Sequence, residues 1–183
     1  MHPIAALADI FRRCGTPWAV VGAHAANVYR RAIRTTLDVD VLVSLGTKEM
    51  AVVADAMVAD GWRIKRTMPE GWLLRVVHPT FGPADIIAAG VEYQEIALAR
   101  AQDRTFPGVT AKVLAVEDVL IHKLIANRAQ DEADVVSILA ANPDLDLEYL
   151  DRWIEFWEVA DRYRRCQAEI TSRGREGDEG DQS

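Results

Sequence analysis

Long apolar runs and an excess of positive charge are missing from this sequence of 183 residues, and cysteine is scarce. No apolar run approaches the roughly 18 to 20 residues that span a bilayer, and no basic N-terminal segment leads into an apolar stretch, so we expect a soluble, cytoplasmic protein with no membrane partner. The net charge of −7 excludes histone-like and polybasic membrane-binding proteins.

Cysteine occurs only at Cys14 and Cys166, and neither lies in a CxxC or Cys-His pattern. Two cysteines this far apart do not make a disulfide framework or a zinc site, so we interpret both as reduced and structural. Apolar residues, in contrast, make up 50% of the chain. That fraction suffices for one compact domain, or for one domain with a small helical appendage.

The N-terminal two-thirds alternates helical patterns with short apolar runs rich in β-branched residues, which is typical of layered α/β or α+β proteins. We predict helices over residues 3–13, 22–31 and 50–60, and strands over residues 18–21, 37–43, 61–66, 72–78 and 84–88. Helical spacing then predicts helices over residues 114–128, 131–139 and 147–163.

These elements predict an α+β fold in which a mixed sheet is flanked by helices and followed by a helical C-terminal part. We expect the α/β core over residues 1–110 and the helical part over residues 111–170. Residues 171–183 combine glycines with charges, so we predict a disordered tail there.

The first chemical signal is Val20-Val21-Gly22-Ala23, where an apolar strand runs through a glycine directly into a helix. Free backbone N–H groups and the positive end of the helix dipole meet at such a point, and together they bind phosphate. A tight turn that needs glycine explains the same pattern. We interpret the neighbouring His24 as a first-turn helix residue rather than a ligand or base.

The second signal is the pair Asp38 and Asp40 in Thr36-Leu-Asp-Val-Asp-Val-Leu-Val43. Strand periodicity puts both carboxylates on one face and the valines on the other. Two like charges on an apolar strand repel one another and lose hydration, a problem that Mg²⁺ or Mn²⁺ solves. The alternative is two solvated carboxylates at an exposed strand end.

Asp85 lies in a further short apolar run, Pro83-Ala84-Asp85-Ile86-Ile87. With Asp38 and Asp40 it completes a set of three carboxylates able to hold two metal ions for in-line attack at phosphorus. Asp85 is then the natural acceptor of the attacking hydroxyl's proton. We expect the three carboxylates to converge in one sheet.

Positive charge gathers just before the aspartate pair. No acidic residue occurs from Ile10 to Leu37, yet that stretch holds five arginines. Arg34, a few residues ahead of Asp38, is the candidate for a phosphate contact. For Arg12 and Arg13 on the first helix, a solvated helix face is the better interpretation.

The helical third carries Glu117-Asp118 and then Lys123 among leucines and isoleucines. The stem of Lys123 should pack on apolar surface while its ammonium reaches a phosphate, or it is simply a helix-surface lysine. Arg128, Asp131 and Asp134 are spaced three apart and are also explained by ion pairs along helix faces.

Together these residues resemble a known family. Gly22-Ala23-x-Ala25 followed by Arg34-Thr-Thr36-x-Asp38-x-Asp40, with Asp85 as the third carboxylate, resembles the opening motif of the DNA-polymerase-β-like nucleotidyltransferase superfamily. The helical motifs Glu117-Asp118-x-x-x-x-Lys123 and Arg128-x-x-Asp131-x-x-Asp134 resemble AbiEii-like toxin nucleotidyltransferases and related uncharacterised bacterial proteins.

The resemblance implies Mg²⁺ or Mn²⁺ ligation by Asp38, Asp40 and Asp85, which would be the catalytic residues. It further implies a site for ATP or a similar nucleotide. Gly22 and Ala23 would bind the nucleotide through their backbone, and the other residues of the site would be Arg34, Thr36 and Lys123. The family usually has Gly-Ser or Gly-Gly where this chain has Gly22-Ala23, so a hydroxyl that often holds the triphosphate is missing.

The function that follows is a metal-dependent nucleotidyltransferase that moves a nucleoside monophosphate from an NTP to an acceptor hydroxyl. The acceptor would be a tRNA end, a protein or a small hydroxylated molecule. In a toxin–antitoxin context, the partner would be a cognate antitoxin. The alternatives are a non-catalytic nucleotide-binding or antitoxin-like interaction module, and a structural α/β protein in which the spacing is coincidental.

Overall fold

The computed structural model describes residues 2–46 and 49–179, with side chains described as far as residue 172. The chain divides into two compact units, and the first comprises Met1–Ala25 and Arg34–Ala115. The second unit comprises Ala26–Ile33 and Val116–Ser183. The division therefore falls at Ala115, near the predicted end of the α/β core, and the segment before Arg34 is grouped with the C-terminal helices.

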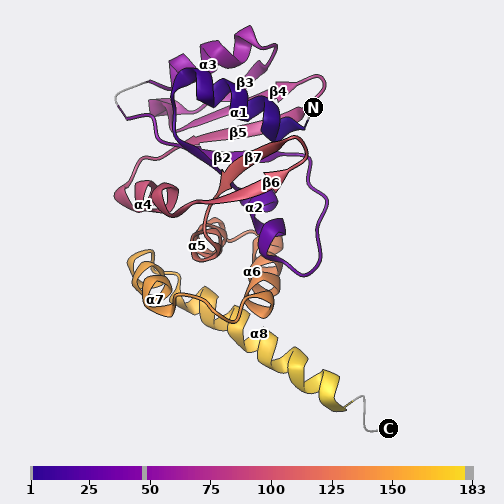
Figure 1. Cartoon of the computed structure of the whole chain (residues 1–183). Helices are drawn as coiled ribbons and strands as arrows, with labels where there is room; N and C mark the ends of the chain where they lie inside the picture. The colour runs from indigo at the N-terminus through magenta and orange to yellow at the C-terminus, as the bar shows by residue number, and fades with distance from the viewer. Residues whose placement is uncertain (1, 47–48, 180–183) are drawn as a thin grey trace. The chain divides into compact units, whose positions relative to one another are not determined.

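The first unit is built on a seven-stranded mixed sheet with the order β3-β4-β5-β2-β1-β7-β6 (Figure 1). The strands are β1 (Trp18–Val21), β2 (Val39–Val43), β3 (Arg63–Thr67), β4 (Leu73–His78), β5 (Gly82–Ala88), β6 (Gln102–Phe106) and β7 (Val109–Val113). The pairs β2–β5 and β1–β7 are parallel, whereas the other neighbours are antiparallel.

Helices of the first unit pack on this sheet: they are α1 (Pro3–Cys14), α3 (Met50–Ala59), α4 (Glu92–Arg100) and the start of α2 (Gly22–Tyr29), with a short 3₁₀ turn η1 (Pro69–Gly71). In Figure 1, α1 and α3 lie together on one side of the sheet. Buried α1 residues such as Leu7 and Phe11 supply that layer, and the helix ends at Gly15 with φ +57°. Glycine adopts this conformation without steric cost.

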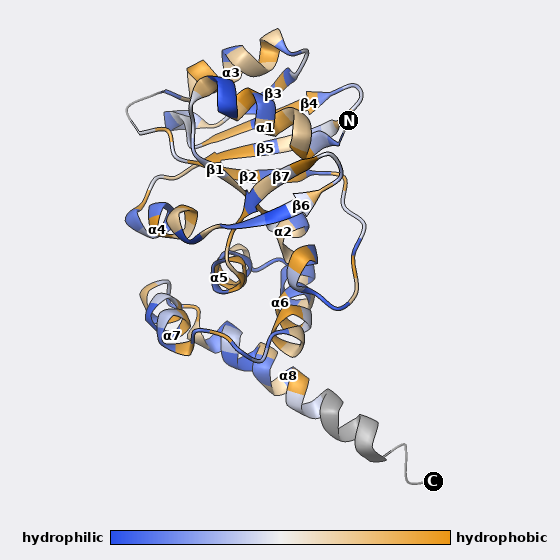
Figure 2. Ribbon diagram, viewed as in Figure 1, coloured by the Kyte–Doolittle hydropathy of each residue, from blue (hydrophilic) through white to orange (hydrophobic). Residues whose placement is uncertain are grey.

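Hydropathy follows strand position in the sheet (Figure 2). The central strand β5 is largely apolar, and its residues Ala84 and Ile86 are fully buried. The edge strand β6 is hydrophilic, and all five residues of the opposite edge strand β3 are exposed. Inner strands bury an apolar face in the core, whereas edge strands lie open to solvent, which accounts for the difference.

The second unit is helical and contains α5 (Val116–Ala126), α6 (Ala129–Ala141), α7 (Leu147–Phe156) and α8 (Ala160–Glu179). Helix α5 packs on α6 and α7, and α8 packs on α6 and α7. The segment Asn142-Pro143-Asp144 lies between α6 and α7 and is not helical. The mixed sheet with its helices and the helical C-terminal part confirm the predicted α+β class.

Four parts of the chain differ from the sequence prediction. Helix α4 and the hairpin β6–β7 were not predicted, since β6 begins with Gln-Asp-Arg and lacks an apolar alternation. The predicted helix over 147–163 is two helices, because Glu158 takes φ +54° between α7 and α8. Where we predicted a disordered tail, the backbone of residues 171–179 continues α8; a helix already anchored by buried Tyr163 and Cys166 extends readily. Residues 180–183 lie outside the described part.

Within the described residues, no helix has the length and apolar character needed to cross a membrane.

Candidate active site

The turn from β1 into α2 is built around Gly22. This residue has φ +64°, and a Cβ placed on it would lie 2.0 Å from Oδ2 of Asp40. Any other residue would therefore strain the backbone and collide with that carboxylate. The sequence predicted a strand-to-helix turn here, and the structure adds that the turn packs directly against the side chain of Asp40.

Two of the predicted carboxylates lie side by side on neighbouring strands. Asp40 on β2 is opposite Asp85 on the parallel strand β5. The alternating residues Val39 and Val41 on β2 and Ile86 on β5 are fully buried, so both aspartates lie on the other face of the sheet. Adjacent strands are about 4.8 Å apart, which makes these carboxylates near neighbours.

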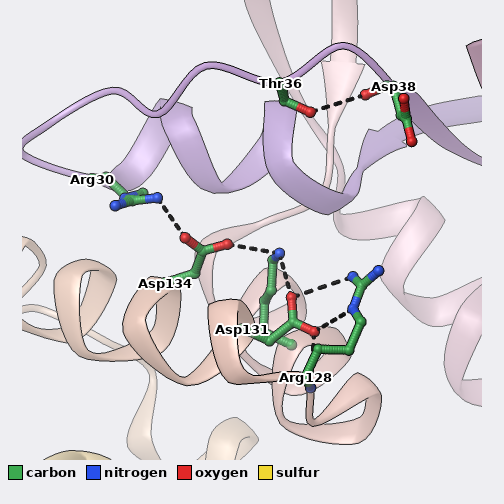
Figure 3. A network of polar contacts seen from close by, with 7 residues as sticks. Arg30, Thr36, Asp38, Arg128, Asp131 and Asp134 are labelled. Atoms are coloured by element: carbon green, nitrogen blue, oxygen red, sulfur yellow. Dashed lines mark hydrogen bonds and ion pairs between the residues drawn. The ribbon is translucent and has the colours of Figure 1, made fainter.

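Asp38 lies just before β2 and is exposed. The hydroxyl of Thr36 donates a hydrogen bond of 3.4 Å to its backbone carbonyl (Figure 3). Thr36 and Arg34 are half-buried in the loop between α2 and β2.

A cation that the sequence analysis missed faces these carboxylates. Arg75, opposite Asp85 on β4, binds both oxygens of Asp85, with Nε–Oδ1 at 2.8 Å and Nη2–Oδ2 at 2.6 Å. The hydrogen bonds that Arg75 donates to Asp85 are the main cause of a raised Arg75 pKa, and the charges of Asp85, Asp38 and Asp40 add to it. All three predicted carboxylates thus act on one guanidinium. A single charge among Leu73-Leu74-Arg75-Val76-Val77 was the available signal.

Carboxylate oxygens are the ligands that Mg²⁺ and Mn²⁺ prefer, so the donor chemistry of Asp38, Asp40 and Asp85 fits a divalent cation. Arg75 supplies positive charge at the same place. In the described part of the chain, however, no three Asp, Glu, His or Cys side chains are gathered tightly enough to form a metal site. The Arg75–Asp85 pair would have to open for Asp85 to become a ligand.

Two further arginines of the basic stretch, Arg12 and Arg13, form ion pairs away from the candidate site. Arg12 and Arg13 both pair with Asp9 on their own helix, and Arg13 also pairs with Asp60. Both arginines are exposed. The interpretation as a solvated helix face is confirmed for these two residues.

His24 in the first turn of α2 contacts an aromatic cluster. Its ring lies edge-on to that of His2 at 6.3 Å between centroids, and His2 stacks on Phe106. Burial, with a smaller contribution from the charge of His2, lowers the pKa of His24. His24 thus belongs to this aromatic cluster at the start of α2.

In the second unit, Lys123 belongs to an ion network with Asp131 and Asp134, both of which are labelled in Figure 3. Its ammonium contacts Asp131 Oδ1 at 2.7 Å and Asp134 Oδ2 at 2.8 Å, and its side chain is only 3% exposed. Asp131 also accepts a 2.7 Å hydrogen bond from Nε of Arg128, and Asp134 pairs with Arg30. Lys123, which was predicted to bind phosphate, thus has two carboxylate partners. Because Lys123 is on α5 and both aspartates are on α6, these ion pairs join the two helices.

The other acidic pair of the helical motif is also engaged within the second unit. Asp118 Oδ1 accepts a 2.7 Å hydrogen bond from the hydroxyl of Tyr149, and Glu117 Oε1 accepts one of 3.1 Å from the backbone of Asp146. Nδ1 of His122 donates to the carbonyl of Asp118 at 2.8 Å. These contacts tie α5 to the start of α7, so this half of the motif stabilises the helical fold.

Comparison with known proteins identifies relatives of the fold. No protein-family model matches the chain, and no curated protein sequence matches it either. Solved structures do match. The lincomycin-bound lincosamide antibiotic adenylyltransferase LnuA has 12% identity and a TM-score of 0.58, with 76% of this chain and 96% of that chain covered.

The antibiotic-resistance factor ANT(2'')-Ia has 13% identity and a TM-score of 0.57, covering 94% of this chain and 96% of its own. An antigenic nucleotidyltransferase-like protein from Paracoccidioides brasiliensis has 15% identity and a TM-score of 0.51, with 75% and 72% covered. At such identities the likeness establishes a common architecture: this chain has the fold of nucleotidyltransferases.

Proposed function

We propose that the protein is a metal-dependent nucleotidyltransferase that transfers a nucleoside monophosphate from an NTP to an acceptor hydroxyl. The observation that carries this proposal is the packing of the Asp40 carboxylate against the Gly22 turn, with Asp85 beside it in register. A phosphate-binding helix start and paired carboxylates are the two parts that phosphoryl chemistry needs at one place.

Each residue has a role in this scheme. Asp38, Asp40 and Asp85 would hold Mg²⁺ or Mn²⁺, which when bound neutralises triphosphate charge and acidifies the attacking hydroxyl. The backbone N–H groups of Gly22 and Ala23 would bind the triphosphate. Because Ala23 has no hydroxyl, that contact comes from the backbone of the turn.

The loop before β2 completes the nucleotide site. Arg34 would contact phosphate, and Thr36 would hold the loop that carries Asp38. Lys123, which the family pattern associates with nucleotide binding, is already balanced by two aspartates. We assign it to positioning α5 and α6 instead of a direct phosphate contact.

The reaction would be an in-line displacement at the α-phosphorus. The acceptor oxygen forms a bond to that phosphorus while the bond to the bridging oxygen breaks, and pyrophosphate leaves with the electron pair. The acceptor proton passes to the carboxylate of Asp85, once this side chain has parted from Arg75. Positioning and charge neutralisation supply the rate enhancement.

Incubation with Mg²⁺ and labelled NTPs tests this proposal, with total tRNA, cell extract or a hydroxylated antibiotic as acceptor. We expect label transfer and pyrophosphate release that require both metal and Asp40. Absence of metal-dependent turnover with every NTP, in a protein that is folded by circular dichroism, would contradict the proposal. A toxin–antitoxin role with a cognate antitoxin, as in AbiEii-like proteins, would place the acceptor among cellular RNAs or proteins.

A second candidate function is a non-catalytic nucleotide-binding or antitoxin-like interaction module. It is favoured by the bidentate Arg75–Asp85 pair, which neutralises the third carboxylate without a metal. Thermal stabilisation by each NTP, with and without Mg²⁺, separates the two functions. Metal-independent stabilisation without turnover supports the module, whereas metal-dependent stabilisation with turnover supports the enzyme.

A further inference from the structure

The edge strand β3 has an unusual composition for its position. Its sequence is Arg-Ile-Lys-Arg-Thr, all five residues are exposed, and none is acidic. Charges on edge strands discourage pairing with other chains. Edge protection alone would explain the composition, but it does not require the cations to share one face of the sheet.

A β-bulge puts two of these cations on the same face. Arg63 pairs with Val77 and Ile64 with Val76, and after the register shift Arg66 pairs with Arg75, so Lys65 is the extra residue. In a regular strand, residues three apart face opposite sides. The extra residue re-aims the strand, and Arg63 and Arg66 both lie on the face of Arg75.

This face continues in register to the candidate active site. Arg66 is opposite Arg75, Arg75 is opposite Asp85, and Asp85 is opposite Asp40. Leu74 on β4 is fully buried on the other face and lines a groove with Met50 of α3. The arginines and the two aspartates therefore form one row across four strands.

The row is electrostatically uneven. Arg66 and Arg75 are like charges directly opposite one another, an arrangement that destabilises a sheet unless an anion lies between them. Asp85 partners Arg75, but neither Arg63 nor Arg66 forms an ion pair within residues 2–46 and 49–172. Guanidinium groups in this setting are well suited to bidentate phosphate contacts.

The strand order gives the site two sides. The Gly22 turn, where the triphosphate would bind, follows β1 on one side of Asp40, whereas β4 and β3 lie beyond Asp85 on the other. On the proposed function Asp85 takes the acceptor's proton, so the acceptor approaches from the side of the arginines. We propose that Arg63, Arg66 and Arg75 form a subsite that binds a phosphate group of the acceptor.

This inference rests on the proposed function and narrows its substrate class to phosphate-bearing hydroxyl compounds. The phosphate group would belong either to the phosphodiester backbone of a nucleic-acid strand or to a free nucleotide. A polycationic acceptor would be repelled by Arg63 and Arg66, since β3 carries no acidic residue. Because the basic row is short and the whole chain has a net charge of −7, it would bind the end of one nucleic-acid strand or a single nucleotide, not a long duplex.

The test measures acceptor binding with the nucleotide site filled by Mg²⁺ and a non-hydrolysable NTP analogue. The probes are a fluorescent single-stranded RNA oligonucleotide and a nucleoside 5′-monophosphate, and the variant is Arg63→Ala/Arg66→Ala. We expect the variant to weaken binding roughly tenfold or more at low salt and to reduce the salt dependence of oligonucleotide binding. The charge-matched control Arg12→Ala/Lys112→Ala removes two cations from elsewhere in the unit and should leave binding unchanged.

The outcomes are distinct. Weaker binding of both probes supports the subsite, and a larger loss for the oligonucleotide identifies the phosphodiester backbone as the phosphate source. Equal affinity for the variant and the control, or binding of neither probe by the unaltered protein, overturns the subsite. Mg²⁺-dependent thermal stabilisation by NTP is recorded in the same samples: if it persists, only the acceptor inference fails, and if it is absent, the proposed function fails as well.

Discussion

Two clusters of aspartates and cations in this protein have opposite environments. In the second unit, Lys123 and its two aspartate partners are at most 3% exposed. In the first unit, the Arg75 side chain is 51% exposed and that of Asp85 is 18% exposed. Similar ion pairs thus serve different ends: a sealed network holds helices together, whereas an open pair can exchange its partner for a ligand.

The physical reason lies in solvation. Removing one member of a buried ion pair leaves a charge that water cannot reach, so the partners are fixed. An exposed pair is worth little because water replaces either partner, and its carboxylate is available to a cation. The two motifs contain the same residue types, so the sequence does not distinguish a buried ion pair from an exposed one. The exposed fractions of the side chains in the structure do. The following predictions test this difference, from the largest expected effect to the smallest.

The substitution Asp40→Asn removes the carboxylate that packs on Gly22. We expect nucleotidyl transfer to fall by about a thousandfold, since a metal ligand and its charge are lost, with the circular dichroism spectrum unchanged. Asp103→Asn, on the exposed Lys112–Asp103 pair, is the control and should keep full activity. Equal activity of both variants would show that the open cluster is not catalytic.

In the sealed network, Lys123→Met should lower the free energy of unfolding by about 3 kcal/mol, because two buried aspartates lose their shared cation. Urea denaturation measures the change. Lys112→Met, which removes a half-exposed lysine of one ion pair, should cost less than about 1 kcal/mol. A loss as small for Lys123 as for Lys112 would contradict the sealed character of the network.

The Gly22 turn can be tested against a matched glycine. Gly22→Ala and Gly46→Ala both place a Cβ at positive φ, at +64° and +59°, but only the first Cβ meets Asp40. Both should lose about 1–2 kcal/mol of unfolding free energy from the backbone. Only Gly22→Ala should also abolish Mg²⁺-dependent stabilisation by NTP; the same loss in Gly46→Ala would remove the role assigned to the turn.

Arg75→Gln frees Asp85 from its bidentate partner. Since a half-exposed ion pair contributes up to about 1 kcal/mol, Mg²⁺ affinity should rise roughly two- to fivefold. Isothermal calorimetry in the presence of an NTP analogue measures the change. Unaltered or weaker Mg²⁺ binding would mean that Arg75 does not compete for the carboxylate.

The smallest effect concerns pH. Burial lowers the pKa of His122 from its ordinary 6.5, so the unfolded chain binds a proton more readily than the folded one. His122 therefore supports stability above pH 6.5, and this contribution falls as the pH drops from 6.5 toward the folded pKa. We expect a decrease on the order of 1 kcal/mol at pH 5.5, which His122→Asn should reduce. A pH profile identical in both proteins would rule out this residue.

Much of the candidate site could be predicted locally. Alternation of valine and aspartate fixed the face on which Asp40 lies, because a strand has a period of two residues. The glycine between an apolar strand and a helix predicted the turn at Gly22. Helix α4 and strand β6 were not predicted, because neither has a strongly apolar face. A single sequence offers only short-range hydrophobic patterns as a signal for such elements.

The sequence by itself determined which residue types line each strand and helix, and thereby the α+β class and the aspartates of the site. Tertiary structure alone decided which charges meet: that Arg75 holds Asp85, that Lys123 lies between Asp131 and Asp134, and that a bulge turns Arg66 toward Arg75. Local patterns follow from the geometry of one strand or helix. Pairings between distant segments depend on strand order, register and burial, which only the folded chain establishes.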